Sequence, residues 1–159
     1  MDEQIRKAMV ELIMSSHEAV VCSIDENGFP NAKSMFLREN EEIYKFWFSS
    51  NLSAIHTQQW LKNSKACVYF ANRQDIIGLM LTGDMRVYTD DKTKQLHWQQ
   101  RDEKYYALGP TDPDYCMLCF TATRGNYMAQ NKYVFDMSDD NDTSIYKYDN
   151  KWNIEPNTR

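Results

Sequence analysis

Hydroxyl and imidazole side chains follow a bulky, strand-like run in the segment FWFSSNLSAIHTQQW, residues 46–60. Ser50 and Ser53 lie at the expected start of a helix, and His56 follows one turn later on the same face. The first N–H groups of a helix lack intrahelical partners, and the helix dipole adds partial positive charge at that end. The segment therefore predicts a cradle for a phosphate group. A serine N-cap beside a surface histidine is the competing interpretation.

Elsewhere in the sequence, the residue types that act in catalysis or bind metals do not form a recognisable motif. His17, His56 and His97 do not share metal-ligand spacing, and no nucleophile-elbow or P-loop motif occurs. Cys116 and Cys119 have the spacing of half a metal site, but they fall in a strand-like run, where positions three apart face opposite sides. We expect the four cysteines to be core thiols and predict no metal site. A bound cofactor would then supply any catalytic chemistry.

Hydrophobic periodicity outlines the elements that position this segment. Residues 2–15 predict an amphipathic helix, and Gly28 lies in an Asn-Gly turn between two β-type runs, which predicts a hairpin. A polar turn follows at 39–42, and the next strand runs directly into a helix over 51–62. The apolar residues of this helix are expected to contact the core: Leu52, Ile55 and Leu61.

The second half of the chain predicts more strands around a second main helix. Residues 65–71 form one strand, and 76–89 are long enough for a bent strand with a bulge at Gly83. Residues 90–107 predict the helix, which carries Leu96, Trp98, Tyr105 and Tyr106, and two further strands follow it. Many short antiparallel strands with few helices favour a small barrel, because closure removes exposed sheet edges.

The composition fits a folded, soluble protein. Of the 159 residues, 42% are hydrophobic and 13% aromatic, and the formal net charge of -5 argues against a broad surface for nucleic acid. No apolar run approaches the roughly 20 residues that span a bilayer, and the N-terminus lacks a secretory signal pattern. We expect a cytoplasmic protein with no nucleic-acid or membrane partner. Residues 1–140 are interpreted as one domain, and 141–159 as a polar tail with room for one short strand.

Three segments in a fixed order resemble a known family. They are GFPNAK at 28–33, FWFSSNLSAIH with WLKNSKACVYF at 46–70, and Trp98 with GPTDPDYCMLCFTATRGNYM up to residue 128. Together they resemble the FMN-binding split barrel of the pyridoxamine 5'-phosphate oxidase-like superfamily, and within it the general stress protein 26-like flavoproteins. The resemblance covers about residues 5–130. It implies a mainly β fold, a split β-barrel of six to seven antiparallel strands with two to three helices.

The resemblance also implies a homodimer that binds FMN in two clefts between the subunits. Side chains of the second strand, of the turn after the third strand and of the helix that follows would bind the phosphate: Lys33, Ser49 or Ser50, Ser53 and His56. One stretch of backbone would flank the edge of the isoalloxazine ring: Lys33, Ser34, Met35 and Phe36. Trp98 is the implied contact from the second subunit.

The chain departs from the oxidases of this family at several positions. His56 stands where the helix usually carries Lys or Arg, and Lys33 stands where the oxidases carry Arg, whose guanidinium binds phosphate bidentately. The C-terminal Arg and Trp of the oxidase site are not recognisable after Tyr127, so true pyridoxamine 5'-phosphate oxidase activity is not expected. The resemblance implies an FMN-dependent oxidoreductase whose substrate and electron donor are unknown. A non-catalytic flavin-binding, storage or stress-related module, and a barrel that has lost flavin, are the alternatives.

Overall fold

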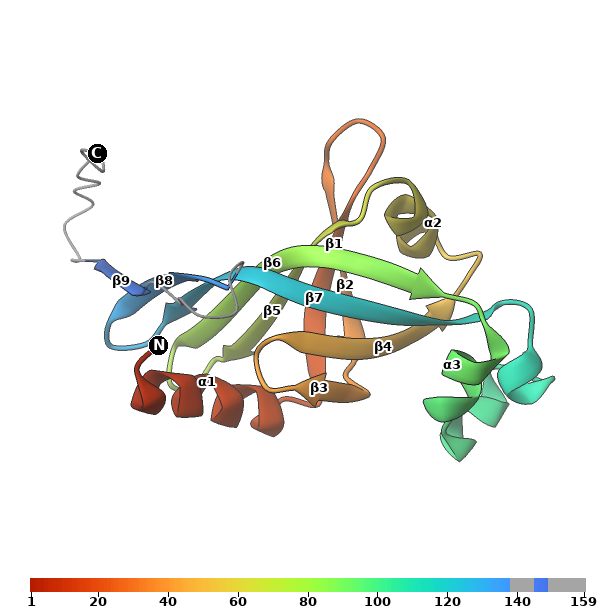
Figure 1. Cartoon of the computed structure of the whole chain (residues 1–159), viewed down its shortest axis with the longest axis horizontal. Coiled ribbons are helices and arrows are strands. Elements are labelled where there is room, and N and C mark those ends of the chain that lie inside the picture. The colour runs from red at the N-terminus through yellow and green to blue at the C-terminus, as the bar shows by residue number, and fades with distance from the viewer. Residues whose placement is uncertain (138–144, 149–159) are drawn as a thin grey trace.

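A curled antiparallel sheet dominates the computed structural model, which describes residues 1–137 and 145–148 (Figure 1). The strands are β1 (Glu18–Ile24), β2 (Pro30–Phe36), β3 (Glu39–Glu41), β4 (Lys45–Asn51), β5 (Lys65–Asn72), β6 (Ile77–Tyr88), β7 (Tyr115–Met128), β8 (Lys132–Asp136) and β9 (Ile145–Tyr148). The helices are α1 (Glu3–Ser15), α2 (Ile55–Lys62) and α3 (Asp91–Leu96), with short 3-10 turns η1 (Gln100–Lys104) and η2 (Gly109–Thr111). None of these described helices has the length and apolar character needed to cross a bilayer.

The sheet has the topology of a split barrel. Its main path runs β2-β1-β5-β6-β7-β4-β3, and β8 pairs with β7 and with β9. The two sides of this path approach each other, because β2 contacts β4, although no ladder joins them in the part of the chain that the structure describes. The predicted mainly β split-barrel fold is therefore confirmed.

The β1–β2 hairpin forms around the predicted Asn-Gly turn and projects from the body of the sheet (Figure 1). Gly28 has a φ of 86°, a left-handed conformation that glycine adopts without strain. The Asp25 carboxylate accepts hydrogen bonds from the backbone N–H groups of Asn27, at 2.9 Å, and Phe29, at 2.8 Å. These bonds fix the turn and with it the register that places Lys33 opposite Val21.

A bulge bends the long β6–β7 ribbon at the predicted position. The register shifts between Thr82 and Gly83, so that Thr123 of β7 has no opposing residue on β6. A Cβ at Gly83 would lie 2.0 Å from the Thr121 carbonyl oxygen, so only glycine fits this close approach of two backbones. The bend lets both strands curl around the core.

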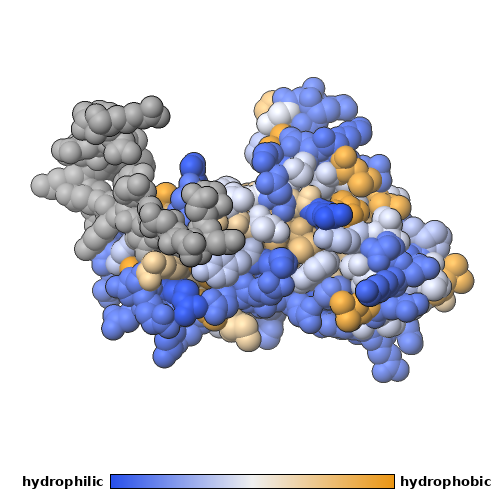
Figure 2. Space-filling view, in the orientation of Figure 1, coloured by the Kyte–Doolittle hydropathy of each residue, from blue (hydrophilic) through white to orange (hydrophobic). Residues whose placement is uncertain are grey.

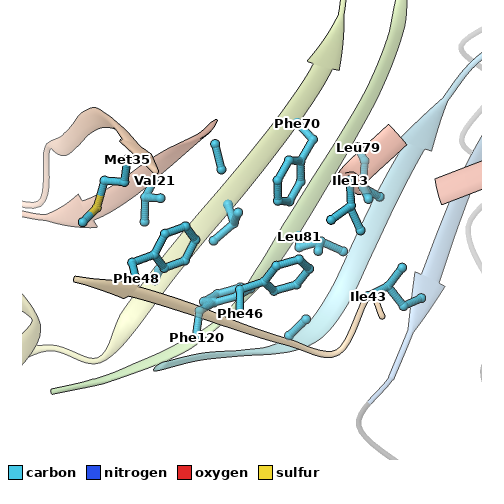
Figure 3. Close-up of a cluster of buried hydrophobic side chains, with 14 of the residues drawn as sticks. Ile13, Val21, Met35, Ile43, Phe46, Phe48, Phe70, Leu79, Leu81 and Phe120 are labelled. Atoms are coloured by element: carbon cyan, nitrogen blue, oxygen red, sulfur yellow. The ribbon is translucent and has the colours of Figure 1, made fainter. Parts of the chain in front are cut away.

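The core fills the inside of the curled sheet (Figure 3). Helix α1 contributes the apolar face that its sequence predicts, with Met9, Leu12 and Ile13 buried. Aromatic rings from three strands meet inside the barrel: Phe46, Phe48, Phe70 and Phe120. On the face in Figure 2, by contrast, hydrophilic residues predominate, with hydrophobic patches scattered among them.

Helix α2 begins later than predicted. It starts at Ile55 with Ala54 as its N-cap, so the predicted start at residue 51 and the role of Ser50 as N-cap were wrong. The predicted core face was also wrong for two residues, since Ile55 is 72% exposed and Leu61 55% exposed, whereas Leu52 does pack against the core. The residues of α2 that are buried are His56, Thr57 and Trp60.

The single helix predicted over 90–107 was wrong as well. Helix α3 ends at Leu96, and η1 starts a new turn with Gln99 as its N-cap. A capping box causes the break, because the Gln99 N–H donates to the Asp102 carboxylate at 3.2 Å. The polar turn predicted at 39–42 is likewise largely a strand, since β3 pairs with β4.

Candidate functional site

A cavity of about 530 Å³ opens where β2, β4 and η1 meet, a size typical of small-molecule sites. One wall comes from β2 and the residues after it: Lys33, Ser34, Met35, Phe36 and Arg38. The end of β4 contributes Ser49, Ser50 and Asn51. The facing wall comes from η1 and the residues after it: Arg101, Asp102, Lys104, Tyr105 and Tyr106.

Positive charge dominates this cavity although the chain as a whole is acidic, with a net charge of -5. Arg38 pairs with the one carboxylate on the wall, Asp102, and the remaining charges are those of Lys33, Arg101 and Lys104. Arg101 has no acidic partner among the described residues, and Lys104 lies 4.7 Å above the Tyr105 ring. The cavity therefore favours an anionic ligand.

A buried ion pair ties the η1 wall to the sheet. The side chains of Arg38 and Asp102 are 6% and 3% exposed, and Nη2 of Arg38 donates to Oδ1 of Asp102. The same guanidinium donates to the Ser49 hydroxyl at 2.6 Å and, through Nη1, to the Gln99 side-chain oxygen at 2.6 Å. Arg38 thus fixes both the Ser49 hydroxyl and the position of η1.

The Ser50 hydroxyl reaches the cavity from a buried polar cluster. Its Oγ lies 2.8 Å from Nε2 of His56 and accepts a hydrogen bond from Thr57 at 3.1 Å. His56 is only 5% exposed and is not among the cavity-lining residues. Burial, and secondly the positive charge of Lys33, lower the pKa of His56 to about 4. At neutral pH the imidazole is uncharged and acts on Ser50 through a hydrogen bond.

The turn between β4 and α2 binds a carboxylate from its own chain. The Ser53 N–H and hydroxyl donate to Asp114 at 2.7 and 2.9 Å, and the Asn51 amide donates to the same carboxylate at 2.7 Å. Hydrogen bonds from Asn51, and then from Ser53, lower the pKa of Asp114. The Asp114 carboxylate therefore occupies the turn before α2, and Ser53, which the sequence placed at a phosphate, binds this carboxylate and does not line the cavity.

Trp98 lies behind the η1 wall. Its ring packs edge-to-face on Tyr115, with ring centroids 5.1 Å apart, and on Tyr106, at 6.3 Å. Tyr106 in turn lines the cavity and donates from its hydroxyl to the Asn51 side chain at 3.3 Å. In this chain Trp98 supports the cavity wall, and its contact with a second subunit stays a prediction.

Sequence reasoning located one side of the cavity and missed the other. Six of the predicted residues line it: Lys33, Ser34, Met35, Phe36, Ser49 and Ser50. Three lie outside the lining: Ser53, His56 and Trp98. The missed residues are Arg38, Asn51, Arg101, Asp102, Lys104, Tyr105 and Tyr106. The segment RDEKYY carries basic residues three positions apart, a pattern that could have indicated a positively charged surface. It was missed because these residues were assigned to one continuous helix and not to a wall of the cavity.

Comparisons with known proteins give both a matching family model and similar solved structures. Residues 3–139 match the family model described as "Pyridoxamine 5'-phosphate oxidase like". A solved protein from Clostridium acetobutylicum is 37% identical, and the match covers 87% of this chain and 98% of that one, with a TM-score of 0.79. It is described as related to general stress protein 26 of B. subtilis, in the pyridoxinephosphate oxidase family. A search of curated proteins gave no match.

More distant structures share the fold. General stress protein 26 from Bacillus anthracis is 14% identical with a TM-score of 0.66, over 91% of this chain and 99% of that one. A pyridoxamine 5'-phosphate oxidase-related, FMN-binding protein from Nostoc punctiforme is 11% identical with a TM-score of 0.67, over 92% and 94% of the two chains. At these identities the likeness concerns the fold alone.

Proposed function

The chain belongs to the pyridoxamine 5'-phosphate oxidase-like family, and from this premise we propose that it binds FMN in the cavity between β2, β4 and η1. We propose further that it is an FMN-dependent oxidoreductase acting on a small molecule. The cavity combines an anion-binding side and an apolar side, and FMN requires both. The flavin binding of the Nostoc punctiforme relative supports the same assignment.

The cavity has a polar part that suits a phosphate group and an apolar part that suits a flat ring, and this composition is the main support for FMN binding. Lys33 supplies a positive charge beside the hydroxyls of Ser49 and Ser50, a donor set that suits a phosphate group. Met35 and Phe36 continue the same wall with apolar surface, and Tyr105, just after η1, lies on the facing wall. A flat ring system that extends from the phosphate would lie against these side chains.

FMN, when bound, would supply the redox chemistry. The residues of this chain bind and orient it. Lys33 provides a point charge, and the Ser50 hydroxyl is held in place by His56 and Thr57. Arg38 is already engaged by Asp102 and Ser49, so its role is to hold the facing wall at a fixed distance from β4. The cavity is thus preorganised before a ligand enters.

We also propose that the chain forms a homodimer whose partner completes the FMN site. Two large side chains at the cavity are open to solvent, since Phe36 is 65% exposed and Tyr105 67% exposed. A second copy would cover this apolar surface and the open seam between β2 and β4. Trp98 remains the proposed contact from the partner side.

A non-catalytic flavin-binding module is the second candidate. The one carboxylate on the cavity wall, Asp102, is held by Arg38 in a buried pair and is poorly placed to move a proton. A wall whose described residues offer no free carboxylate favours binding or storage of flavin over turnover. Failure of NADH and NADPH to reduce the bound flavin would support this candidate.

Purified protein tests the proposal directly. It should carry a flavin absorbance spectrum or acquire one on addition of FMN, and it should bind FMN more tightly than riboflavin, which lacks the phosphate. Anaerobic addition of NADH or NADPH should bleach the bound flavin if the chain is an oxidoreductase, whereas bleaching by dithionite alone supports the non-catalytic module. Protein that binds neither flavin would refute both candidates. Light scattering of the FMN-loaded protein should report a dimer.

A further inference from the structure

Cys22 and Cys67 face each other directly across the β1–β5 ladder. Their neighbours Val21 and Val68 are 1% and 0% exposed and point into the core, so the two cysteines point to the outer face of the sheet, where both are half-buried. The sequence had favoured core thiols at both positions, and the register places them outside instead. Directly opposed residues of an antiparallel pair have Cα atoms about 4.5–5.5 Å apart. The Cα atoms of a disulfide lie about 4.4–6.8 Å apart, so the register of this pair is compatible with a disulfide.

We propose that Cys22 and Cys67 form an oxidation site, at which a peroxide converts the two thiols into a reversible cross-strand disulfide. The thiolate of one cysteine attacks a peroxide oxygen and becomes a sulfenic acid, while the O–O bond breaks and releases water or an alcohol. The second thiol then attacks this sulfur, the S–S bond forms, and a water molecule leaves. The two thiols lose two electrons in total, and the peroxide gains them.

A disulfide between Cys22 and Cys67 would fix the β1–β2 hairpin against β5. Three residue pairs join β1 to β5, whereas seven join β1 to β2. The hairpin that carries Lys33 through Phe36 is therefore joined to β5 by a short ladder, of which Cys22 and Cys67 form the last pair. Ser23 and Asn31 also connect the hairpin to α2 through the Gln59 side chain. A covalent bond between the two cysteines would lock the hairpin, and with it one wall of the cavity, against β5.

The reduced thiols should react slowly at neutral pH. Burial raises the pKa of both thiols, and that of Cys67 reaches about 11. Because the thiolate is the nucleophile, the rate of oxidation should rise by up to about tenfold for each pH unit between pH 7 and 9. The site would therefore respond to sustained peroxide and not to a brief pulse.

The chain itself makes the site easy to map. Cleavage after Lys and Arg places Cys22 in the peptide 8–33 and Cys67 in 66–73, while Cys116 and Cys119 share the peptide 105–124. The full-length protein would be treated with hydrogen peroxide at pH 8, blocked with iodoacetamide, digested without reductant and analysed by mass spectrometry. We expect 8–33 joined to 66–73 with the loss of two hydrogen atoms, and 105–124 with both buried cysteines alkylated after unfolding.

Stability provides a second readout. The intramolecular bond should raise Tm by roughly 5–10 °C, reversed by dithiothreitol. Cys22→Ser and Cys67→Ser should abolish this shift, whereas Cys119→Ser should keep it. Oxidation of Cys22 or Cys67 to sulfinic acid without a joined peptide, or a disulfide between two chains on a non-reducing gel, would overturn the proposal. None of these measurements depends on flavin binding, so they stand apart from the proposed function.

Discussion

The Ser50 hydroxyl oxygen lies 2.8 Å from Nε2 of His56, a buried residue that does not line the cavity. Thr57 donates to the same oxygen at 3.1 Å. When Nε2 of His56 carries its proton, Ser50 accepts both hydrogen bonds, and its own O–H makes only a long bond of 3.4 Å to the Asn51 carbonyl, which it would exchange for a phosphate oxygen in the cavity. His56 would then contribute to phosphate binding as a neutral residue behind Ser50 and not as a charged ligand.

This relationship predicts how FMN affinity responds to substitution at His56. His56→Ala should weaken FMN binding by roughly 2- to 10-fold, the value of one neutral hydrogen bond, and His56→Gln, which keeps a donor, should recover much of the loss. Fluorescence titration at about pH 6 and pH 8 should give the same ratio of wild-type to variant affinity, because His56 is uncharged throughout this range. A wild-type advantage that grows at the lower pH would show that a charged imidazole contacts the phosphate.

Burial of His56 also predicts a pH dependence of folding stability. Its pKa of about 4 in the folded chain lies below the unfolded value of about 6.5, so the unfolded chain binds a proton more readily. The free energy of unfolding should be unaffected by this group above about pH 6.5, and it should fall by roughly 3 kcal/mol as pH drops to 4. Urea unfolding of wild type and His56→Gln at pH 7, 5.5 and 4.5 would check this. As pH falls, the free energy of unfolding of wild type should decrease relative to that of His56→Gln. A difference between the two proteins that stays constant with pH would contradict the prediction.

Lys33 is expected to distinguish FMN from riboflavin. Lys33→Ala should weaken FMN binding by roughly 1.5–3 kcal/mol, or about ten- to a hundredfold, because one charge-assisted hydrogen bond is lost. Riboflavin affinity should change little. Lys92→Ala, at an exposed position on α3 outside the cavity, is the matched control and should leave both affinities unchanged. Equal losses for FMN and riboflavin would place Lys33 at the ring and not at the phosphate.

Local patterns in the sequence were sufficient for the strands and for one side of the cavity. Asn27-Gly28 fixed the hairpin and its register, and Gly83 marked the bulge, because both depend on backbone conformations that few residues adopt. The η1 wall was missed because it depends on contacts between distant segments. The Asp102 carboxylate accepts a hydrogen bond from the N–H of Gln99, the N-cap of η1, and this interaction interrupts the predicted helix. Asp102 can be buried there because its charge is neutralised by Arg38, 64 residues earlier in the chain. The start of α2 was misplaced for a similar reason, since Asp114 holds the residues before it.

The Arg38–Asp102 pair predicts a strong and non-additive effect on stability. Arg38→Met leaves a buried carboxylate without its partner, and Asp102→Leu leaves a buried guanidinium, so each should lower the free energy of unfolding by roughly 3–5 kcal/mol. The double variant Arg38→Met/Asp102→Leu removes both charges and should lose less than the sum of the two single variants by at least about 1 kcal/mol. Urea unfolding of the four proteins gives this coupling directly. The surface pair Lys65–Asp84, with side chains 65% and 44% exposed, is the control, and its coupling should stay below about 1 kcal/mol. Additive losses at Arg38 and Asp102 would mean that the two residues act independently, Arg38 through the side chains of Ser49 and Gln99, and Asp102 through the Gln99 N–H.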